Sequence, residues 1–235
     1  TATLENCSNT GAVESTGIYT GGLLGNNAST SLTLTDCTNG NSVHSTNANV
    51  GGLIGYFSPN GNGTLDITRC SNTGMVSTSL SSATLRVGGL VGWLRGVSGN
   101  TGNVVKCWNT GEIKGTGSSK GTLAGLVGVS GGSTLLTLTD CYNTGVVTGT
   151  TIAGTLATGT PTTTINVTNC WNSGTVTGSG TDASLAVTAA NGKNAVQVDG
   201  ESATFKDLSM TVSGVRGLQV NVDNTSDALV IDNCD

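Results

Sequence analysis

A short phrase, Cys-x-Asn-x-Gly, occurs six times in the chain of 235 residues and constrains the fold more than any other feature. Successive cysteines of the phrase are 30, 33, 37, 34 and 29 residues apart. They are Cys7, Cys37, Cys70, Cys107, Cys141 and Cys170. Only the second copy departs from the phrase, with Asn41 in place of the glycine. A nearly constant period of this length is typical of repeat proteins, in which each unit buries its apolar side against the next.

The segments that precede the cysteines alternate between apolar and polar residues. Residues 32–35 read Leu-Thr-Leu-Thr, and residues 165–168 read Ile-Asn-Val-Thr. This two-residue period, rich in β-branched residues, predicts short strands with one buried face. Glycine, asparagine, serine and threonine recur every few residues, so no segment offers the apolar stripe that a helix needs.

Strands this short need partners, and the equivalent strand of the next repeat can supply one. The repeats then stack into an all-β fold, a right-handed parallel β-helix (β-solenoid) of about seven coils with no significant helix. The right-handed sense follows from the general preference of parallel crossovers. Residues 1–186 provide the regular coils, and residues 187–235 a degenerate last coil with an inserted hairpin or loop, marked by Asn-Gly at 191–192 and Asp-Gly at 199–200.

Equivalent residues of stacked repeats lie above one another, so each repeated position predicts a column. The six cysteines of the phrase are expected to form an inward column of reduced thiols. The chain has seven cysteines in all, an odd number, and one per coil at even spacing argues against disulfide pairing. The asparagines two residues later should form an inward amide ladder, bonded to the turn backbone and to the next amide. They are Asn9, Asn39, Asn72, Asn109, Asn143 and Asn172. The glycine that follows is expected at a left-handed corner, which Asn41 also tolerates.

A second phrase, of the form Gly-Gly-Leu-x-Gly, occurs at residues 21–25, 51–55 and 88–92, and with an initial alanine at 124–128. Its alternation with Cys-x-Asn-x-Gly resembles the GLUG-motif repeats of bacterial secreted and cell-surface proteins, over about residues 1–180. The resemblance implies an extracellular or cell-surface location in a large modular protein of a kind sometimes linked to adhesins or surface proteases. It carries over no catalytic residue. The phrase decays at residues 153–157 and 182–186, where the corners should be less tight.

Composition argues against several classes of function. The formal net charge of −5 is opposite to what a phosphate backbone attracts, so no nucleic-acid partner is expected. No apolar run approaches the roughly 20 residues of a membrane helix, so no membrane insertion is expected. A metal site is not expected either, because the chain has a single histidine, His44, and no Cys-x-x-Cys pair. No cofactor is predicted.

Catalysis by a β-helix needs acids, or acids with arginine or lysine, clustered on one face of neighbouring coils. The residues before the cysteines instead read as a charge-balanced column with Asp36 above Arg69 and Lys106 above Asp140. Ion pairs of this kind on a surface contribute little and indicate no chemistry. The chain is therefore not expected to be an enzyme, with a polysaccharide lyase or hydrolase as the alternative.

Aromatic residues suggest where a ligand would bind. Trp108, Tyr142 and Trp171 directly follow their cysteines in successive coils, and Tyr56 and Trp93 hold matching places after the glycine phrase. We interpret such columns as binding faces for a glycan or a host surface protein, since sugar rings and partner side chains pack well on aromatic surfaces. The open alternative is a ladder that only covers a corner.

These observations predict an extracellular structural or adhesive β-solenoid module, with a carbohydrate-binding or carbohydrate-cleaving β-helix as the alternative. Both ends of the chain lie at the strand that precedes a cysteine, and neither shows a cap. An open terminal strand is a template for pairing. The expected partners are therefore flanking repeats of a parent protein, or a second copy stacked head to tail into a filament.

Overall fold

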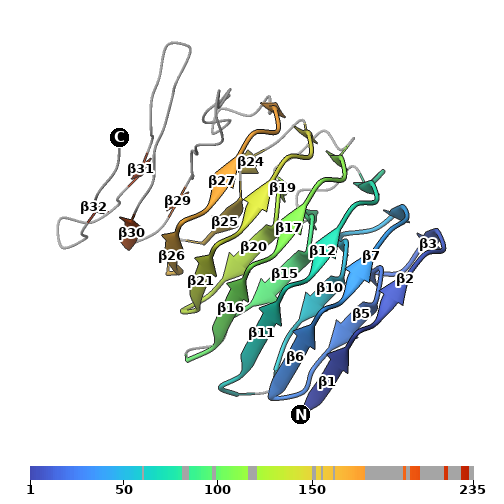
Figure 1. Cartoon of the computed structure of the whole chain (residues 1–235), viewed down its shortest axis with the longest axis horizontal. Helices are drawn as coiled ribbons and strands as arrows, with labels where there is room; N and C mark the ends of the chain where they lie inside the picture. Colours follow the sequence, from blue (N-terminus) through green and yellow to red (C-terminus); the bar gives the residue numbers. More distant parts are fainter. Residues whose placement is uncertain are drawn as a thin grey trace.

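The computed structural model describes residues 1–59, 61–80, 85–96, 99–115, 121–149, 152–154, 156–160 and 162–177, and the strands at 198–199, 202–206, 220–221 and 229–232. Within these residues every regular element is a strand, and none is a helix. Every strand pair is parallel, and equivalent strands of successive coils lie side by side (Figure 1). The predicted β-solenoid is confirmed.

Each complete coil contributes one strand to each of five sheets, called here the first to the fifth in chain order. The first sheet consists of β1 (Ala2–Glu5), β6 (Ser31–Thr35), β11 (Thr64–Thr68), β16 (Thr101–Val105), β21 (Leu135–Thr139), β26 (Thr164–Thr168), β30 (Ser202–Lys206) and β32 (Leu229–Asp232). The second consists of β2 (Ser8–Asn9), β7 (Thr38–Asn39), β12 (Ser71–Asn72), β17 (Trp108–Asn109), β22 (Tyr142–Asn143) and β27 (Trp171–Asn172). The third consists of β3 (Val13–Ser15), β8 (Val43–Ser45), β13 (Val76–Thr78), β18 (Ile113–Gly115), β23 (Val147–Thr148) and β28 (Val176–Thr177).

The remaining strands return the chain to the start of the next coil. The fourth sheet consists of β4 (Tyr19–Gly21), β9 (Asn49–Gly51), β14 (Arg86–Gly88), β19 (Thr122–Ala124) and β24 (Ile152–Gly154). The fifth consists of β5 (Leu24–Asn27), β10 (Ile54–Phe57), β15 (Val91–Arg95), β20 (Val127–Gly131) and β25 (Ala157–Gly159). A separate parallel pair joins β29 (Val198–Asp199) and β31 (Val220–Asn221).

The described strands make five complete turns, fewer than the seven expected, although the first sheet continues to eight strands. In the first sheet β30 pairs with β26, with Phe205 opposite Val167 in the register. Most of residues 187–235, including the hairpin or loop expected around residues 191–192, lie outside the described residues. The sixth coil has strands in the first, second and third sheets, and the residues that follow it, 178–197, lie outside the described part of the chain.

The interior is divided into two apolar clusters. The larger lies between the first and fifth sheets and includes Leu34, the thiol of Cys37 and Ile54. The smaller lies between the third and fourth sheets and includes Val43 and Val87. Strands such as β6 and β11 alternate between fully and partly buried positions, as the two-residue period predicts. Each coil therefore buries apolar residues in two separate compartments.

Asparagines and glycines meet between these compartments. A Cβ placed on Gly52 would lie 2.5 Å from Cγ of Asn72, and one placed on Gly89 would lie 2.5 Å from Cγ of Asn109. Along each coil, the second sheet lies between the first and the third, while these glycines lie between the fourth and the fifth. The two repeated phrases of the sequence thus contact each other across the interior, and only a residue without a side chain allows this approach.

The left-handed corner of each coil lies one residue before the cysteine, not at the glycine where it was expected. The six residues there have φ between 49° and 55°. They are Asn6, Asp36, Arg69, Lys106, Asp140 and Asn169. Asparagine and aspartate tolerate this conformation, whereas arginine and lysine adopt it at a greater cost. The backbone N–H of Arg69 is bonded to Val105 O of the next coil at 3.0 Å, so the corner also takes part in coil pairing.

The glycine of Cys-x-Asn-x-Gly is needed for a different reason, which is the close approach of successive coils. A Cβ on Gly111 would lie 1.9 Å from the carbonyl oxygen of Gly74, and one on Gly145 would lie 2.0 Å from that of Gly111. In the first coil the space is larger, because a Cβ on Gly11 would meet nothing closer than Asn9 Oδ1, at 3.7 Å.

These distances predict opposite effects for one substitution at two equivalent sites. Gly111→Ala should lower the free energy of unfolding by at least about 1–3 kcal/mol, because the coils must separate to admit the methyl group. Gly11→Ala should be neutral or stabilise the protein by up to about 1 kcal/mol, because it restricts only the unfolded chain. Chemical denaturation of both variants measures the difference. Equal effects at the two sites would contradict the close-approach explanation.

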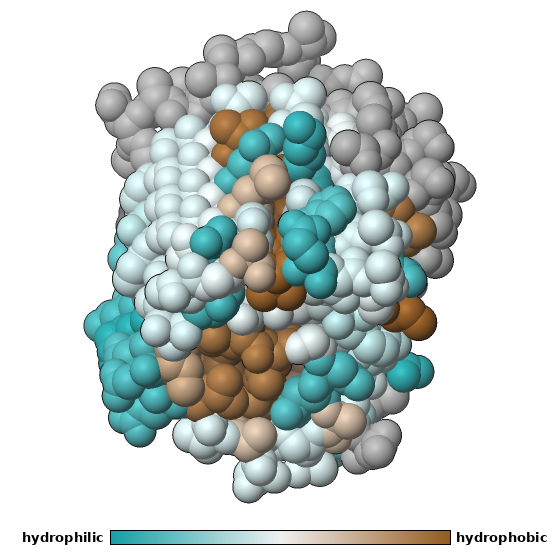
Figure 2. Space-filling view, turned by 90° about the vertical axis from the view of Figure 1, so that its right-hand side faces the viewer, coloured by the Kyte–Doolittle hydropathy of each residue, from teal (hydrophilic) through white to brown (hydrophobic). Residues whose placement is uncertain are grey.

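The N-terminal coil presents apolar side chains at the surface. Figure 2 views the molecule from the side on which this coil lies and shows an apolar patch bordered by hydrophilic residues. Residues of this coil that are partly buried against the larger cluster include Ala2, Leu4, Cys7, Leu23 and Leu24. A neighbouring coil would cover such side chains, as it does within the stack.

Candidate functional site

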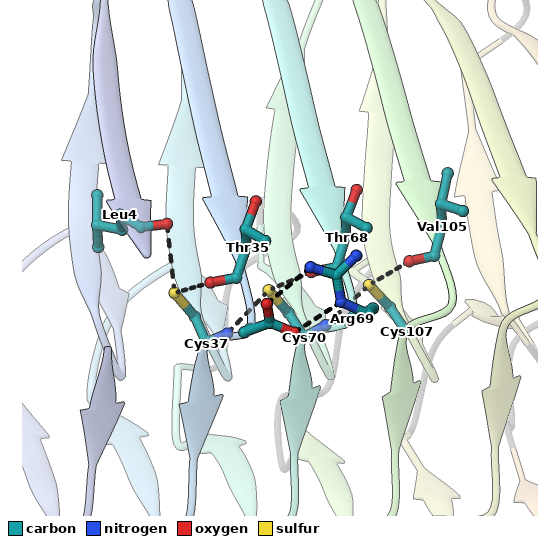
Figure 3. A network of polar contacts seen from close by, with 9 residues as sticks. Leu4, Thr35, Cys37, Thr68, Arg69, Cys70, Val105 and Cys107 are labelled. Carbon is teal, nitrogen blue, oxygen red and sulfur yellow. Dashed lines mark hydrogen bonds and ion pairs between the residues drawn. The ribbon is translucent and has the colours of Figure 1, made fainter. Parts of the chain in front are cut away.

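The cysteine column lies inside the solenoid, as expected (Figure 3). Cys7 is half-buried and the other five cysteines of the column are buried, and all six are free thiols. The backbone N–H of Cys37 donates to Sγ of Cys70 at 3.3 Å, and that of Cys70 donates to Sγ of Cys107 at 3.3 Å. Each of these thiols donates in turn to the carbonyl oxygen two residues before it, as Cys37 does to Thr35 at 3.2 Å.

Burial makes these thiols poor candidates for chemistry. Desolvation raises the pKa of Cys37. Hydrogen bonds with Cys141 and Cys70, together with burial, raise the pKa of Cys107. A thiol must lose its proton to act as a nucleophile or metal ligand, so these two remain neutral packing residues of the core. Hydrogen bonds with Cys107 lower the pKa of Cys70 and of Cys141, but both thiols are fully buried, so the column packs as part of the core.

The asparagine ladder forms as the sequence predicts. Within it, Nδ2 of each of the first five asparagines donates to Oδ1 of the asparagine in the next coil at 2.7–2.8 Å. The second N–H of each amide donates to the backbone oxygen two residues further on, at 2.6–2.8 Å. Five of the six asparagines are fully buried. Every amide group thus has partners in its own turn and in the neighbouring coils, which satisfies polar atoms that would be costly to bury alone.

Removing one amide from the middle of this ladder should destabilise the protein. Asn109→Ala would remove one of the two acceptors of Asn72 Nδ2 and would remove the donor to Asn143 Oδ1 and to the oxygen of Gly111. We expect the free energy of unfolding to fall by at least about 1–3 kcal/mol. The control is Asn166→Ala, at a half-buried outward position of β26, where a change within about 0.5 kcal/mol is expected. Equal stability of the two variants in urea would show that the ladder contributes nothing.

The charged column before the cysteines is a surface feature. Arg69 contacts both carboxylate oxygens of Asp36 at 2.7 Å, and these hydrogen bonds lower the pKa of Asp36. Both side chains are exposed, so the pair adds little stability. The second expected pair was Lys106 with Asp140. This prediction is wrong, because among the described residues no ion pair joins these two side chains. Asp140 instead accepts a hydrogen bond from Nδ2 of Asn169.

The first aromatic cluster lies on the second sheet and is called here the aromatic column. It comprises Trp108, Tyr142 and Trp171, which are opposite one another in register and half-buried. Their ring centroids are 5.9 Å and 4.5 Å apart, with interplanar angles of 8° and 6°. Because the rings stack on each other, their faces are largely occupied, and a ligand would meet their outer edges. The binding face expected from the sequence is therefore a row of ring edges.

The second cluster lies on the fourth and fifth sheets. Tyr19 stacks on Tyr56 with centroids 4.2 Å apart, and Trp93 lies 4.7 Å from Tyr56 at 37°. The guanidinium carbon of Arg86 lies 3.9 Å from the Trp93 ring centroid, a cation–π contact. Nη1 of Arg95 donates to the Tyr56 hydroxyl at 3.3 Å. The five aromatic residues singled out in the sequence thus belong to two clusters on different sheets.

A groove adjoins the second cluster at the level of the third to fifth coils. Its volume is about 300 Å³, and its walls include Arg86, Trp93, Arg95 and Thr122. Sequence reasoning identified Trp93 but missed Tyr19, Arg86, Arg95 and Thr122. The register pairs Tyr19 with Asn49, Asn49 with Arg86, and Arg86 with Thr122, so three of the missed residues share one column of the fourth sheet.

Comparison with known proteins adds no identification, since no family model, curated protein or solved structure matches the chain. The resemblance to GLUG-motif repeats therefore stays a prediction. In the part of the chain that the structure describes, no helix could cross a membrane. The same residues hold no group of three or more histidine, cysteine, aspartate or glutamate side chains placed to bind a metal ion.

Proposed function

We propose that this chain is an extracellular structural and adhesive β-solenoid module that contacts its partner through surface aromatic residues. The observation that carries the proposal is the placement of these residues. All three tryptophans and all three tyrosines of the chain lie in the two aromatic clusters, and all of them except the buried Tyr56 are partly exposed. Tryptophan and tyrosine are the residues most enriched at binding hot spots, where a large ring and a polar edge act together.

The scaffold suits such a role because it holds these side chains at fixed spacing. Trp108 and Tyr142 each directly precede an asparagine of the buried ladder, so the ladder fixes the strands that carry the rings. Little rotamer freedom is lost when a ligand binds to side chains that are already stacked. The GLUG resemblance supports an extracellular or cell-surface location for the same proposal.

The proposal includes a further coil as the partner of the N-terminal coil. The apolar patch of Figure 2 supports this, because stacked coils cover such surfaces within the protein. Flanking repeats of a parent protein and a second copy in a filament would both provide that coil. Carbohydrate binding remains the second candidate function, favoured by the groove beside Trp93.

A binding screen tests the adhesive role. The wild-type chain should retain one class of ligand on arrays of glycans and of host surface proteins. The triple variant Trp108→Ala, Tyr142→Ala and Trp171→Ala should lose that binding while keeping the β-sheet circular-dichroism spectrum. The matched control Trp108→Phe, Tyr142→Phe and Trp171→Phe keeps the stack and should retain part of the affinity.

Two results would contradict this proposal. A wild-type chain that binds nothing on either array would be a spacer without adhesive function. A triple alanine variant that binds as tightly as wild type would show that the aromatic column only covers a corner, which was the alternative left open by the sequence.

A further inference from the structure

The groove beside Trp93 lies where a stack of aromatic side chains ends. In the fifth sheet, Tyr56 is opposite Trp93, and Trp93 is opposite Val129. Val129 and Gly131 line the groove, so small residues follow the indole in the next coil. A Cβ on Gly131 would lie 3.2 Å from Nε1 of Trp93, which shows how closely the indole N–H approaches this strand. The volume of about 300 Å³ is at the lower end of the range for small-ligand sites.

Two polar atoms of the groove residues are buried without a hydrogen-bond partner in the described structure. They are Nε1 of Trp93 and Oγ1 of Thr122. Nearly all buried polar atoms in proteins have a partner, and unsatisfied ones carry a large desolvation cost. Indole nitrogen can only donate, whereas a hydroxyl can donate or accept. Solvent does not reach either atom, so small shifts of the neighbouring strands must accompany binding. A ligand with oxygen acceptors would then satisfy the first atom, and one with hydroxyl groups or acceptors would satisfy the second.

The charge of the groove is positive although the chain as a whole is negative. Arg86 and Arg95 line it, and none of the described lining residues is acidic. Arg86 also packs on the Trp93 ring, and its Nη1 donates to Asn49 Oδ1 at 3.3 Å, which fixes its position. Burial lowers the pKa of Arg86, but a guanidinium remains charged at neutral pH. A fixed cation, Arg86, and a more exposed one, Arg95, in a partly apolar groove select an anionic group.

We propose that this groove binds an acidic saccharide, meaning a sugar ring that carries a carboxylate. The carboxylate lies near Arg86 and Arg95, the ring packs against the apolar wall that includes Val129, and ring or carboxylate oxygens accept from Nε1 of Trp93. A hydroxyl of the sugar pairs with Thr122. The inference deepens the carbohydrate-binding candidate and does not depend on the aromatic column, which lies on another sheet.

Tryptophan fluorescence reports on this groove directly. The chain has three tryptophans, so the variant Trp108→Phe and Trp171→Phe retains Trp93 alone. Titration with oligogalacturonate or hyaluronan oligosaccharides should change its fluorescence in a saturable way that weakens as salt is added. Neutral cello-oligosaccharides and an acidic peptide should leave the fluorescence unchanged.

Substitutions in the groove locate the binding by calorimetry in the otherwise wild-type chain. Trp93→Phe removes the indole N–H, Thr122→Val removes the hydroxyl and Arg95→Gln removes one charge. Each should weaken binding of the acidic oligosaccharide by about tenfold. The matched controls Thr137→Val and Arg69→Gln, on the first sheet and at its corner, should bind as wild type does.

Three results would overturn the proposal. They are a constant Trp93 fluorescence with both acidic saccharides, equal binding of neutral oligosaccharides, and full affinity in all three groove variants. On the arrays, acidic-glycan binding that the triple alanine variant of the aromatic column keeps is assigned to the groove, and binding that this variant loses supports the proposed adhesive function separately. The two proposals therefore fail independently.

Discussion

The hydrogen bond between asparagine amides of successive coils is the interaction on which the rest of the structure depends. A fully buried amide such as that of Asn109 can be satisfied only by groups at fixed positions in its own turn and in the adjacent coils. This requirement fixes the register of the second sheet. It also fixes the spacing between the two apolar clusters, because the amides contact the glycine pair on the far side of the coil.

Other sequence features follow from that contact. Gly52 and Gly89 are needed because an added Cβ would overlap the amide of the next coil. The cysteine, two residues before each asparagine, fills the small space beside the corner and accepts a backbone N–H through sulfur. The corner itself requires left-handed backbone, and the chain accepts this conformation even at Arg69 and Lys106. The conformational cost of the left-handed corner is tolerated in every coil because the buried hydrogen bonds of the asparagine ladder depend on it.

Much of this architecture could be predicted from the period alone, because identical spacing places identical residues in columns. The cysteine and asparagine columns are such cases. The left-handed corner was misplaced because glycine serves two purposes that look alike in a sequence, a positive φ and a close approach of backbones. At Gly111 the second purpose applies.

The groove could not be predicted, because insertions change the number of residues between each cysteine and the groove residues of the same coil. Tyr19 follows Cys7 by 12 residues, whereas Arg86, in the same column, follows Cys70 by 16. Loops of variable length between the third and fourth sheets hide the column until the register is known. The proposed saccharide groove therefore lies where the repeat is broken, whereas the aromatic column uses a position that is equivalent in successive coils.

Hydrogen exchange of the asparagine side-chain amides, followed by nuclear magnetic resonance, tests the central claim most directly. The account predicts slow exchange for the Nδ2 protons of Asn72, Asn109 and Asn143, since both protons of each amide are donated inside the protein. The half-buried Asn166 should exchange rapidly. Exchange of the three buried amides at the rate of Asn166 would contradict the ladder as the interaction that orders the coils.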